Sequence, residues 1–364
     1  MSINSLPSSK KHLSAAVLVL IAAALFGASA PLSKLLLGSF DAITLASFLY
    51  LGSGLGAGVL FLLKRRSHAN QEQHAEARIT RTDVPWLAGA VAAGGIIAPI
   101  LMMLGLSQTP ASTASLLLNF EGVATALLAV FLFKEAVGKR IILAMGLITL
   151  AAILFSWTGG DWGVSLGALA ILSACLFWGI DNNLTRHISA KDPLVIVGIK
   201  GLGAGSFSFF LALALGRPLP ALGPALMALA VGAVCYGLSI QLFILGLRSL
   251  GAARTSTLYG VAPFLGAILS FILLRESPTY LFWVGLPLML AGAALMLSER
   301  HRHLHTHPVL VHTHPHTHDD SHHLHEHAPG EDVAPGVTHA HPHTHPELTH
   351  EHEHTPDLHH WHSH

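Results

Sequence analysis

Two stretches of this 364-residue chain decide its fold, because they repeat each other. Residues 105–135 read GLSQTPASTASLLLNFEGVATALLAVFLFKE, and residues 246–276 read GLRSLGAARTSTLYGVAPFLGAILSFILLRE. They align without a gap at a shift of 141 residues (246 minus 105). The match continues upstream, where LFGASAPLSK at 25–34 aligns with FWGIDNNLTR at 177–186. Glycines and charged residues coincide in the same order, which indicates an internal repeat.

The composition places this repeat in a membrane. The chain is 52% hydrophobic and only 11% charged, with a mean hydropathy of +0.56, whereas soluble chains carry about 25% charged residues. About 20 apolar residues span a bilayer as a helix, and continuous rather than alternating runs favour helices over barrel strands. We predict an all-α membrane protein with ten transmembrane helices, at about 13–36, 42–63, 85–106, 112–133, 140–157, 165–186, 194–215, 224–247, 254–274 and 281–298.

Each copy of the repeat holds five spans, so the second copy must enter the bilayer from the side opposite to the first. After a segment at 1–12, we therefore predict two inverted five-helix repeats at 13–157 and 165–298, followed by a tail at 299–364. Inverted repeats are typical of secondary transporters. Most Lys and Arg residues fall in segments on the side of the N-terminus, which predicts a multi-pass protein of a bacterial-type inner membrane with both termini cytoplasmic.

Three matched elements resemble a known family. The chain resembles the drug/metabolite transporter superfamily, specifically its EamA type, over about residues 13–298. The resemblance implies a metabolite exporter or importer that can draw on the proton gradient. It leaves the solute open, since the superfamily carries amino acids, nucleotide sugars and amines. The matched elements are Phe26-Gly27 with Trp178-Gly179, Ala111–Leu118 with Ala252–Leu258, and Lys134-Glu135 with Arg275-Glu276.

Polar side chains inside the apolar spans are the candidate site, because charged groups are costly in a membrane. Glu121 lies near the middle of the fourth span and could bind a cation or amine, carry a proton, or serve as a structural carboxyl. We expect Asp181 and Lys200 to form an ion pair that acts as a gate, as part of the site, or only structurally. The predicted binding or coupling residues are Glu121, Asn119, Asp181, Asn182, Asn183, Lys200, Gln241 and Tyr259.

Charged residues and glycines also recur at matched places in the two copies. We interpret Lys34 and Arg186 as anchors that reach toward the membrane surface. Glu135 and Glu276 are interpreted as structural groups that bond to a neighbouring helix across a turn. Small residues four apart let helices approach closely, which predicts a packing role for Gly52, Gly56, Gly201 and Gly205.

The tail differs from the rest of the chain and lies outside the family pattern. Residues 301–364 contain 23 of the 27 histidines, interleaved with Pro, Thr, Asp and Glu, a composition that predicts disorder. Imidazoles bind Zn²⁺, Ni²⁺, Co²⁺ and Cu²⁺. The tail could buffer or sense such ions, deliver a transported ion, or only respond to pH. The predicted ligands are His305, His307, His312, His314, His316, His318, His339, His341, His343, His345, His350, His352 and His354.

Three functions remain open at this point. The favoured prediction is alternating-access transport of a small polar metabolite, with the bilayer, the solute and divalent metals as partners. The tail also allows a transition-metal transporter, or a membrane-anchored metal sensor without transport. We find no HExxH, nucleophile elbow or P-loop motif and expect neither an enzyme nor a required cofactor. The zero formal net charge suggests no nucleic-acid partner, and the sequence leaves the oligomeric state open.

Overall fold

The computed structural model describes residues 8–67, 79–133, 138–157, 165–188, 191–250, 252–297, 301–307, 310–316, 339–345 and 348–354. Within these residues, ten helical segments are long and apolar enough to cross a membrane. The predicted all-α membrane fold is confirmed, and the ends of the spans agree with the prediction to within a few residues.

Six of the ten described spans are single helices, and four are built from shorter pieces. The third span begins with the short helix η3, Arg81–Asp83. The single helices are α1 (Ser8–Leu36), α2 (Ala42–Ser67), α7 (Lys139–Ser156), α8 (Leu166–Arg186), α9 (Pro193–Ala214) and α14 (Tyr280–Leu297). The third span continues with α3 (Val84–Ala90), η4 (Val91–Ile97) and α4 (Ala98–Gln108), and the fourth consists of α5 (Ala111–Leu117) and α6 (Phe120–Phe133). The eighth span consists of α10 (Leu222–Val231), η5 (Gly232–Leu238) and α11 (Ser239–Leu250), and the ninth of α12 (Ala252–Tyr259) and α13 (Ala262–Leu274).

The irregular places repeat between the halves, and the sequence-based prediction of continuous helices misses them. The segments η4 and η5 are π-helical and lie 141 residues apart, at the shift that aligns the two copies. The fourth span breaks at residues 118–119 and the ninth at 260–261. At the first break Asn119 Nδ2 bonds the carbonyl of Leu116, and beyond the second Pro263 lies in the first turn of α13. Both features favour the end of one helix and the start of another.

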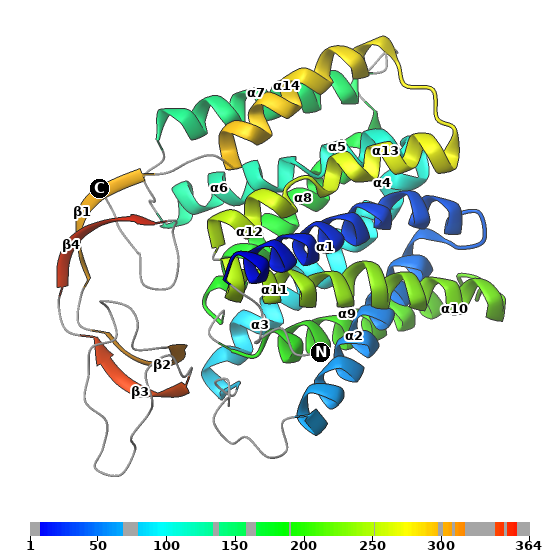
Figure 1. Cartoon of the computed structure of the whole chain (residues 1–364). Coiled ribbons are helices and arrows are strands. Elements are labelled where there is room, and N and C mark those ends of the chain that lie inside the picture. Colours follow the sequence, from blue (N-terminus) through cyan, green and yellow to red (C-terminus); the bar gives the residue numbers. More distant parts are fainter. Residues whose placement is uncertain are drawn as a thin grey trace.

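The spans form two matched bundles and two lateral pairs (Figure 1). In the α1 bundle, α1 packs against the eighth span (α10, η5, α11) and the ninth (α12, α13). In the α8 bundle, α8 packs against the third span (α3, η4, α4) and the fourth (α5, α6). The lateral pairs are α2 with α9 and α7 with α14. The first helix of each repeat thus packs on the third and fourth spans of the other repeat, as a two-fold axis in the membrane plane requires.

Glycine contacts show that the two bundles are matched residue by residue. A Cβ on Gly105 would lie 2.6 Å from Ile171 Cγ1, and a Cβ on Gly246 would overlap Val19 Cγ2. Gly105 and Gly246 differ by 141 residues, while Val19 and Ile171 differ by 152, which is the shift that aligns residues 25–34 with 177–186. The internal repeat in the sequence is therefore a repeat of the packing.

The predicted close approach at glycines is also confirmed. A Cβ on Gly201 would lie 2.5 Å from the backbone nitrogen of Gly54, and one on Gly205 would lie 2.6 Å from that of Leu51, so α9 and α2 pack backbone against backbone. On the other side of α2, a Cβ on Gly52 would overlap the carbonyl of Leu229 in α10. In a membrane the hydrophobic effect does not drive helices together, so helices associate through close packing, which small residues permit.

The two membrane faces are packed differently. We call the face on which α1 begins the amino-terminal face, at the left of Figure 1, and the other the opposite face. Toward the opposite face, α5 of the α8 bundle packs against α13 and α1 of the α1 bundle. Two-fold symmetry would pair α12 with α6 and α8 on the amino-terminal face, but among the described residues these pairs make at most marginal contact.

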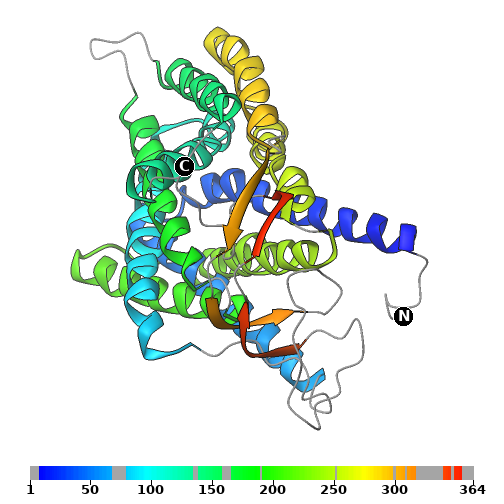
Figure 2. The same ribbon diagram turned by 90° about the vertical axis from the view of Figure 1, so that its left-hand side faces the viewer.

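Four short strands follow the last span on the amino-terminal face (Figures 1 and 2). Strand β1 pairs antiparallel with β4, and β2 pairs antiparallel with β3. An isolated two-stranded pair is at best marginally stable in water, so these strands fit a tail without a packed core. They are β1 (His301–His307), β2 (Leu310–His316), β3 (His339–His345) and β4 (Leu348–His354).

Candidate functional site

Glu121 lies in the first turn of α6, directly after the break in the fourth span. Its Oε1 accepts a hydrogen bond of 2.8 Å from Asn182 Nδ2 on α8. The same amide donates to Thr125 Oγ1 at 3.1 Å, and Thr125 Oγ1 donates to the carbonyl of Glu121 at 2.8 Å. The start of a helix carries partial positive charge, so the break provides a favourable place for a carboxylate inside the membrane.

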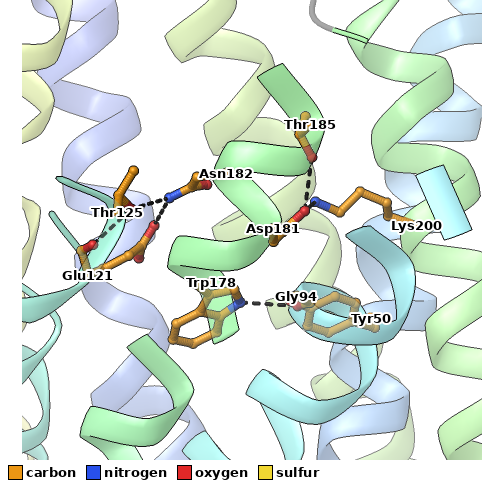
Figure 3. A network of polar contacts seen from close by, with 9 residues as sticks. All are labelled: Tyr50, Gly94, Glu121, Thr125, Trp178, Asp181, Asn182, Thr185 and Lys200. Atoms are coloured by element: carbon orange, nitrogen blue, oxygen red, sulfur yellow. Dashed lines mark hydrogen bonds and ion pairs between the residues drawn. The ribbon is translucent and has the colours of Figure 1, made fainter. Parts of the chain in front are cut away.

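Helix α8 presents polar groups to both sides of its axis (Figure 3). Asn182 points toward Glu121 and Thr125 on α6, whereas Asp181 points toward Lys200 on α9. Asp181 is buried, but Asn182 is exposed although it lies within a transmembrane helix. An exposed amide bonded to Glu121 indicates that this group of residues is reachable from outside the packed core.

The predicted ion pair between Asp181 and Lys200 is confirmed. Lys200 Nζ lies 2.7 Å from Asp181 Oδ1 and 2.6 Å from Oδ2, and Thr185 Oγ1 donates to Oδ1 at 2.9 Å. The carboxylate thus has three donor contacts and its charge is compensated. Loss of one partner of such a buried pair costs about 3–5 kcal/mol, because the other charge is left alone.

The π-helical segment η4 supplies a group that the sequence analysis missed. The carbonyl oxygen of Gly94 accepts hydrogen bonds from Tyr50 Oη at 2.7 Å and from Trp178 Nε1 at 3.1 Å (Figure 3). A Cβ on Gly94 would overlap the carboxylate of Asp181. Gly94 therefore lets the backbone approach the ion pair, while α2 and α8 fix the π-helical turn from two sides. Trp178 belongs to the aromatic-glycine element of the repeat, but no sequence signal indicated Tyr50.

The remaining predicted residues take different places. Asn183 is buried and bonds the carbonyls of Gly179 at 2.8 Å and Thr125 at 3.2 Å, so it ties α8 to α6. Asn119 bonds within the helix break and does not contact Glu121 by a hydrogen bond. Gln241 lies on α11, and in the described part of the chain no hydrogen bond joins it to the other predicted residues.

Tyr259 belongs to an aromatic group on the α1 bundle. Its ring lies 4.7 Å from that of Phe243 and 5.6 Å from that of Phe26, measured between centroids, and Phe26 contacts Tyr236 at 5.9 Å. Tyr236 in turn lies 6.3 Å from Tyr50, which joins this group to the polar residues around Gly94. The α8 bundle thus supplies carboxylates and amides together with Trp178, and the α1 bundle supplies a group of aromatic rings.

The predicted metal ligands lie in the tail, and His318 falls outside the described residues. The register places His303 opposite His352 and His305 opposite His350 in one strand pair, and places His312 opposite His343 and His314 opposite His341 in the other. Directly opposite residues share a face of a ladder with neighbours two positions away. The backbone register thus pairs His-x-His segments with each other in both strand pairs, and imidazole is a donor that Zn²⁺ and similar ions use.

Comparison with known proteins agrees with this architecture. A protein of known crystal structure has the same fold, with a TM-score of 0.55 over 78% of this chain and 95% of its own, at 18% identity. An uncharacterized transporter of Methanothermobacter thermautotrophicus is 30% identical over 76% of this chain and 84% of its own length. A Streptantibioticus cattleyicolor protein named "Probable terminal-alkyne amino-acid exporter" is 28% identical over 59% of this chain and 73% of its own.

The family profile gives the most direct assignment. The profile of the EamA-like transporter family matches twice, at residues 13–157 and 165–298. The two matches cover the ten described spans and leave out the histidine-rich tail. Together with the two inverted bundles, they show that the chain is a multi-pass membrane protein that belongs to the EamA-like transporter family.

Proposed function

We propose that the chain moves a small polar solute across the membrane by alternating access, and that Glu121 holds either an amino group of the solute or a coupling proton. One observation carries this proposal. Among the described residues, the Asp181 carboxylate is neutralised by Lys200, whereas Glu121 has an amide donor but no basic side chain within ion-pair distance. A carboxylate in the membrane interior needs a cation, and a proton or an ammonium group of the solute can supply it.

The surroundings of Glu121 favour a solute with an amino group. Aromatic rings attract ammonium groups through their faces, and the aromatic group of the α1 bundle reaches the polar residues around Gly94, because Tyr236 lies 6.3 Å from Tyr50 between ring centroids. The exposed amide of Asn182 and the hydroxyl of Thr125 offer further polar contacts. The exporter of terminal-alkyne amino acids among the relatives supports solutes of this kind. Amino acids and small amines are therefore the first solutes to test.

Transport in proteoliposomes tests the proposal and separates the two roles of Glu121. A panel of radiolabelled amino acids, amines and neutral sugars is first screened with the unchanged protein. The active solute is then measured in net flux and in solute–solute exchange with Glu121→Gln, and with Glu121→Asp as the conservative control. We expect Glu121→Gln to reduce net flux at least tenfold, with partial recovery in Glu121→Asp.

Exchange decides which cation the carboxylate holds. If Glu121 carries only a coupling proton, Glu121→Gln keeps solute exchange while it loses net flux, because exchange needs no release of the proton. If Glu121 binds the amino group, both modes fail. Unchanged net flux in Glu121→Gln contradicts the proposal.

The orientation and the tail complete the proposed function. The excess of Lys and Arg on the amino-terminal side supports a cytoplasmic location for both termini in an inner membrane. We infer that the tail binds divalent transition metals there, on the basis of its paired His-x-His strands. Metal content of the purified protein, with and without residues 301–364, tests this inference, and equal content in the two forms contradicts it.

The same deletion addresses the two other functions. If solute flux persists without the tail, the tail is regulatory or idle. If metal tolerance of cells collapses while no organic solute moves, a transition-metal transporter is favoured instead. If the full-length protein moves no solute or ion under any condition, the chain is better described as a membrane-anchored metal sensor.

A further inference from the structure

Lys34 near the end of α1 holds the end of α4. Its Nζ donates to the carbonyl oxygens of Leu106 at 2.5 Å, Ser107 at 3.2 Å and Thr109 at 2.9 Å. The last carbonyls of a helix lack partners within the helix and carry partial negative charge, so an ammonium group is well placed there. The prediction that Lys34 is an anchor near the membrane surface did not include these acceptors at the carbonyl end of α4.

Glu276, just beyond α13, holds the start of α5. Its carboxylate accepts hydrogen bonds from the backbone nitrogens of Ala111 at 2.6 Å and Ser112 at 2.9 Å, and from Ser112 Oγ at 2.6 Å. The preceding residue, Arg275, is left-handed with φ of 51°, the one non-glycine residue with positive φ in the described part of the chain. This conformation is unfavourable for a residue with a Cβ, and it turns the chain back toward α5.

Both contacts join the two bundles across the same short connection. Lys34 and Glu276 belong to the α1 bundle, whereas α4 and α5 belong to the α8 bundle. Pro110 lies between the carbonyl of Thr109 that Lys34 binds and the amide of Ala111 that Glu276 binds. We call these contacts the Lys34–Glu276 clamp. It holds the bundles together on the opposite face.

The sequence repeat supplies a matching pair of charged residues, which serves as the control for this clamp. Arg186 corresponds to Lys34 at the shift of 152 residues, and Glu135 corresponds to Glu276 at the shift of 141. Arg186 ends α8, which belongs to the α8 bundle, and the matching acceptors and donors are at the end of α11 and the start of α12 in the α1 bundle. Glu135 itself lies outside the described residues.

Matched serines show that one face is closed. Ser115 in α5 is 1% exposed, and its hydroxyl would lie 2.8 Å from a Cβ on Gly266 of α13. Its counterpart Ser256 in α12 is exposed. The same element of the repeat is therefore buried between the bundles beside the Lys34–Glu276 clamp and uncovered on the amino-terminal face.

From this asymmetry we infer that the Lys34–Glu276 clamp keeps the opposite face closed while the amino-terminal face is open. The inference rests on the proposed alternating access. The clamp couples two charged side chains of the α1 bundle to the ends of two helices of the α8 bundle, so a tilt of the bundles that opens this face has to separate these partners. Lys34 and Glu276 are then positioning residues of the transport cycle.

Thiol labelling tests this inference without knowledge of the solute. Cys175 and Cys235 are replaced by Ala, and a single cysteine is introduced as Ser115→Cys or Ser256→Cys. A membrane-impermeant maleimide is added to either side of sealed vesicles. In the otherwise unchanged chain we expect Ser256→Cys to react from the amino-terminal face and Ser115→Cys to be protected.

Neutral clamp variants should then change the labelling in a predictable direction. In the double variant Lys34→Met with Glu276→Gln, we expect the labelling rate of the cysteine in Ser115→Cys from the opposite face to rise at least about tenfold. This factor corresponds to the loss of one charge-assisted hydrogen bond. The matched control, Arg186→Met with Glu135→Gln, should leave Ser115→Cys protected. If both pairs of substitutions have the same effect, or if Ser115→Cys stays protected in both, the inference is overturned.

Single substitutions keep the test decisive if a double variant does not fold. Glu276→Gln alone retains the shape of the side chain and should still raise labelling of Ser115→Cys by severalfold, with no rise counting against the clamp. Labelling needs no transported solute, so failure of the clamp leaves the Glu121 flux experiment unaffected. The two proposals can therefore fail separately.

Discussion

The two halves share a backbone but differ in the chemistry they bring to the centre of the membrane. The α8 bundle carries Glu121, Asp181 and Trp178, whereas the matching positions of the α1 bundle are Ala262, Ser29 and Phe26. The π-helical segments and helix breaks nevertheless recur in both. Because the two halves share a backbone, the packing on the opposite face has a counterpart of the same kind available on the amino-terminal face, as the proposed alternating access requires. The differing side chains give the α8 bundle the carboxylates of Glu121 and Asp181 beside Trp178, and give the α1 bundle an uncharged group of aromatic rings.

The largest expected effect concerns the ion pair of Asp181 on α8 with Lys200 on α9, which the matched positions of the first repeat lack. Lys200→Met should lower the free energy of unfolding by about 3–5 kcal/mol, because Asp181 is left buried without its cation. The double variant Asp181→Ser with Lys200→Leu copies the counterparts Ser29 and Leu51 and should recover most of the loss. Thermal unfolding in detergent measures both. A double variant no more stable than Lys200→Met contradicts the view that compensation of charge is the main role of Lys200.

A second prediction compares glycines on the two sides of α2. Gly52→Ala should destabilise the fold by about 1–3 kcal/mol, because its Cβ would overlap the carbonyl of Leu229 and the helices would have to move apart. Gly58→Ala, on the same helix, meets nothing within 4 Å and serves as the control, with no loss expected. Equal melting temperatures for the two variants would show that the close contact with α10 is not important for stability.

A smaller effect is expected where aromatic donors fix the π-helical turn in one half alone. Tyr50→Phe and Trp178→Phe each remove a donor to the carbonyl of Gly94, which should cost about 1 kcal/mol per bond. The counterparts in the other half are Ile199 and Phe26, which offer no such donor. Phe26→Tyr, which adds a hydroxyl at the counterpart of Trp178, is the control. A loss in Phe26→Tyr as large as in Trp178→Phe would show that ring packing, not the hydrogen bond, is measured.

The smallest effect is expected from removal of the tail. Deletion of residues 301–364 should leave the melting temperature of the membrane domain unchanged within about 2 °C in metal-free buffer, because the described strand pairs involve only tail residues. Addition of Zn²⁺ should affect only the full-length chain. A shift in the truncated chain that equals the shift in the full-length chain would place metal binding in the membrane domain.

The sequence predicted the parts of this structure that depend on hydrophobicity and on paired charges. Ten spans follow from continuous apolar runs, and the pair of Asp181 with Lys200 follows because a charge in a membrane needs a partner. The π-helical segments and helix breaks were missed, since apolar periodicity is almost the same with and without one irregular turn. The role of Lys34 was also missed, because its acceptors are backbone carbonyls that leave no trace in the residue pattern. Tyr50 joins the site for the same reason.

The central claim is that the two halves cross the membrane in opposite directions. The side of the membrane on which each end of the second half lies tests this claim most directly. Reporter domains are inserted at residues 159–161, between the halves, and fused after residue 297, beyond the last span. Their exposure to protease and to an impermeant label is then measured in sealed vesicles of known orientation. Two five-span halves require the reporters to lie on opposite sides of the membrane. If both reporters lie on the same side, the halves are not inverted.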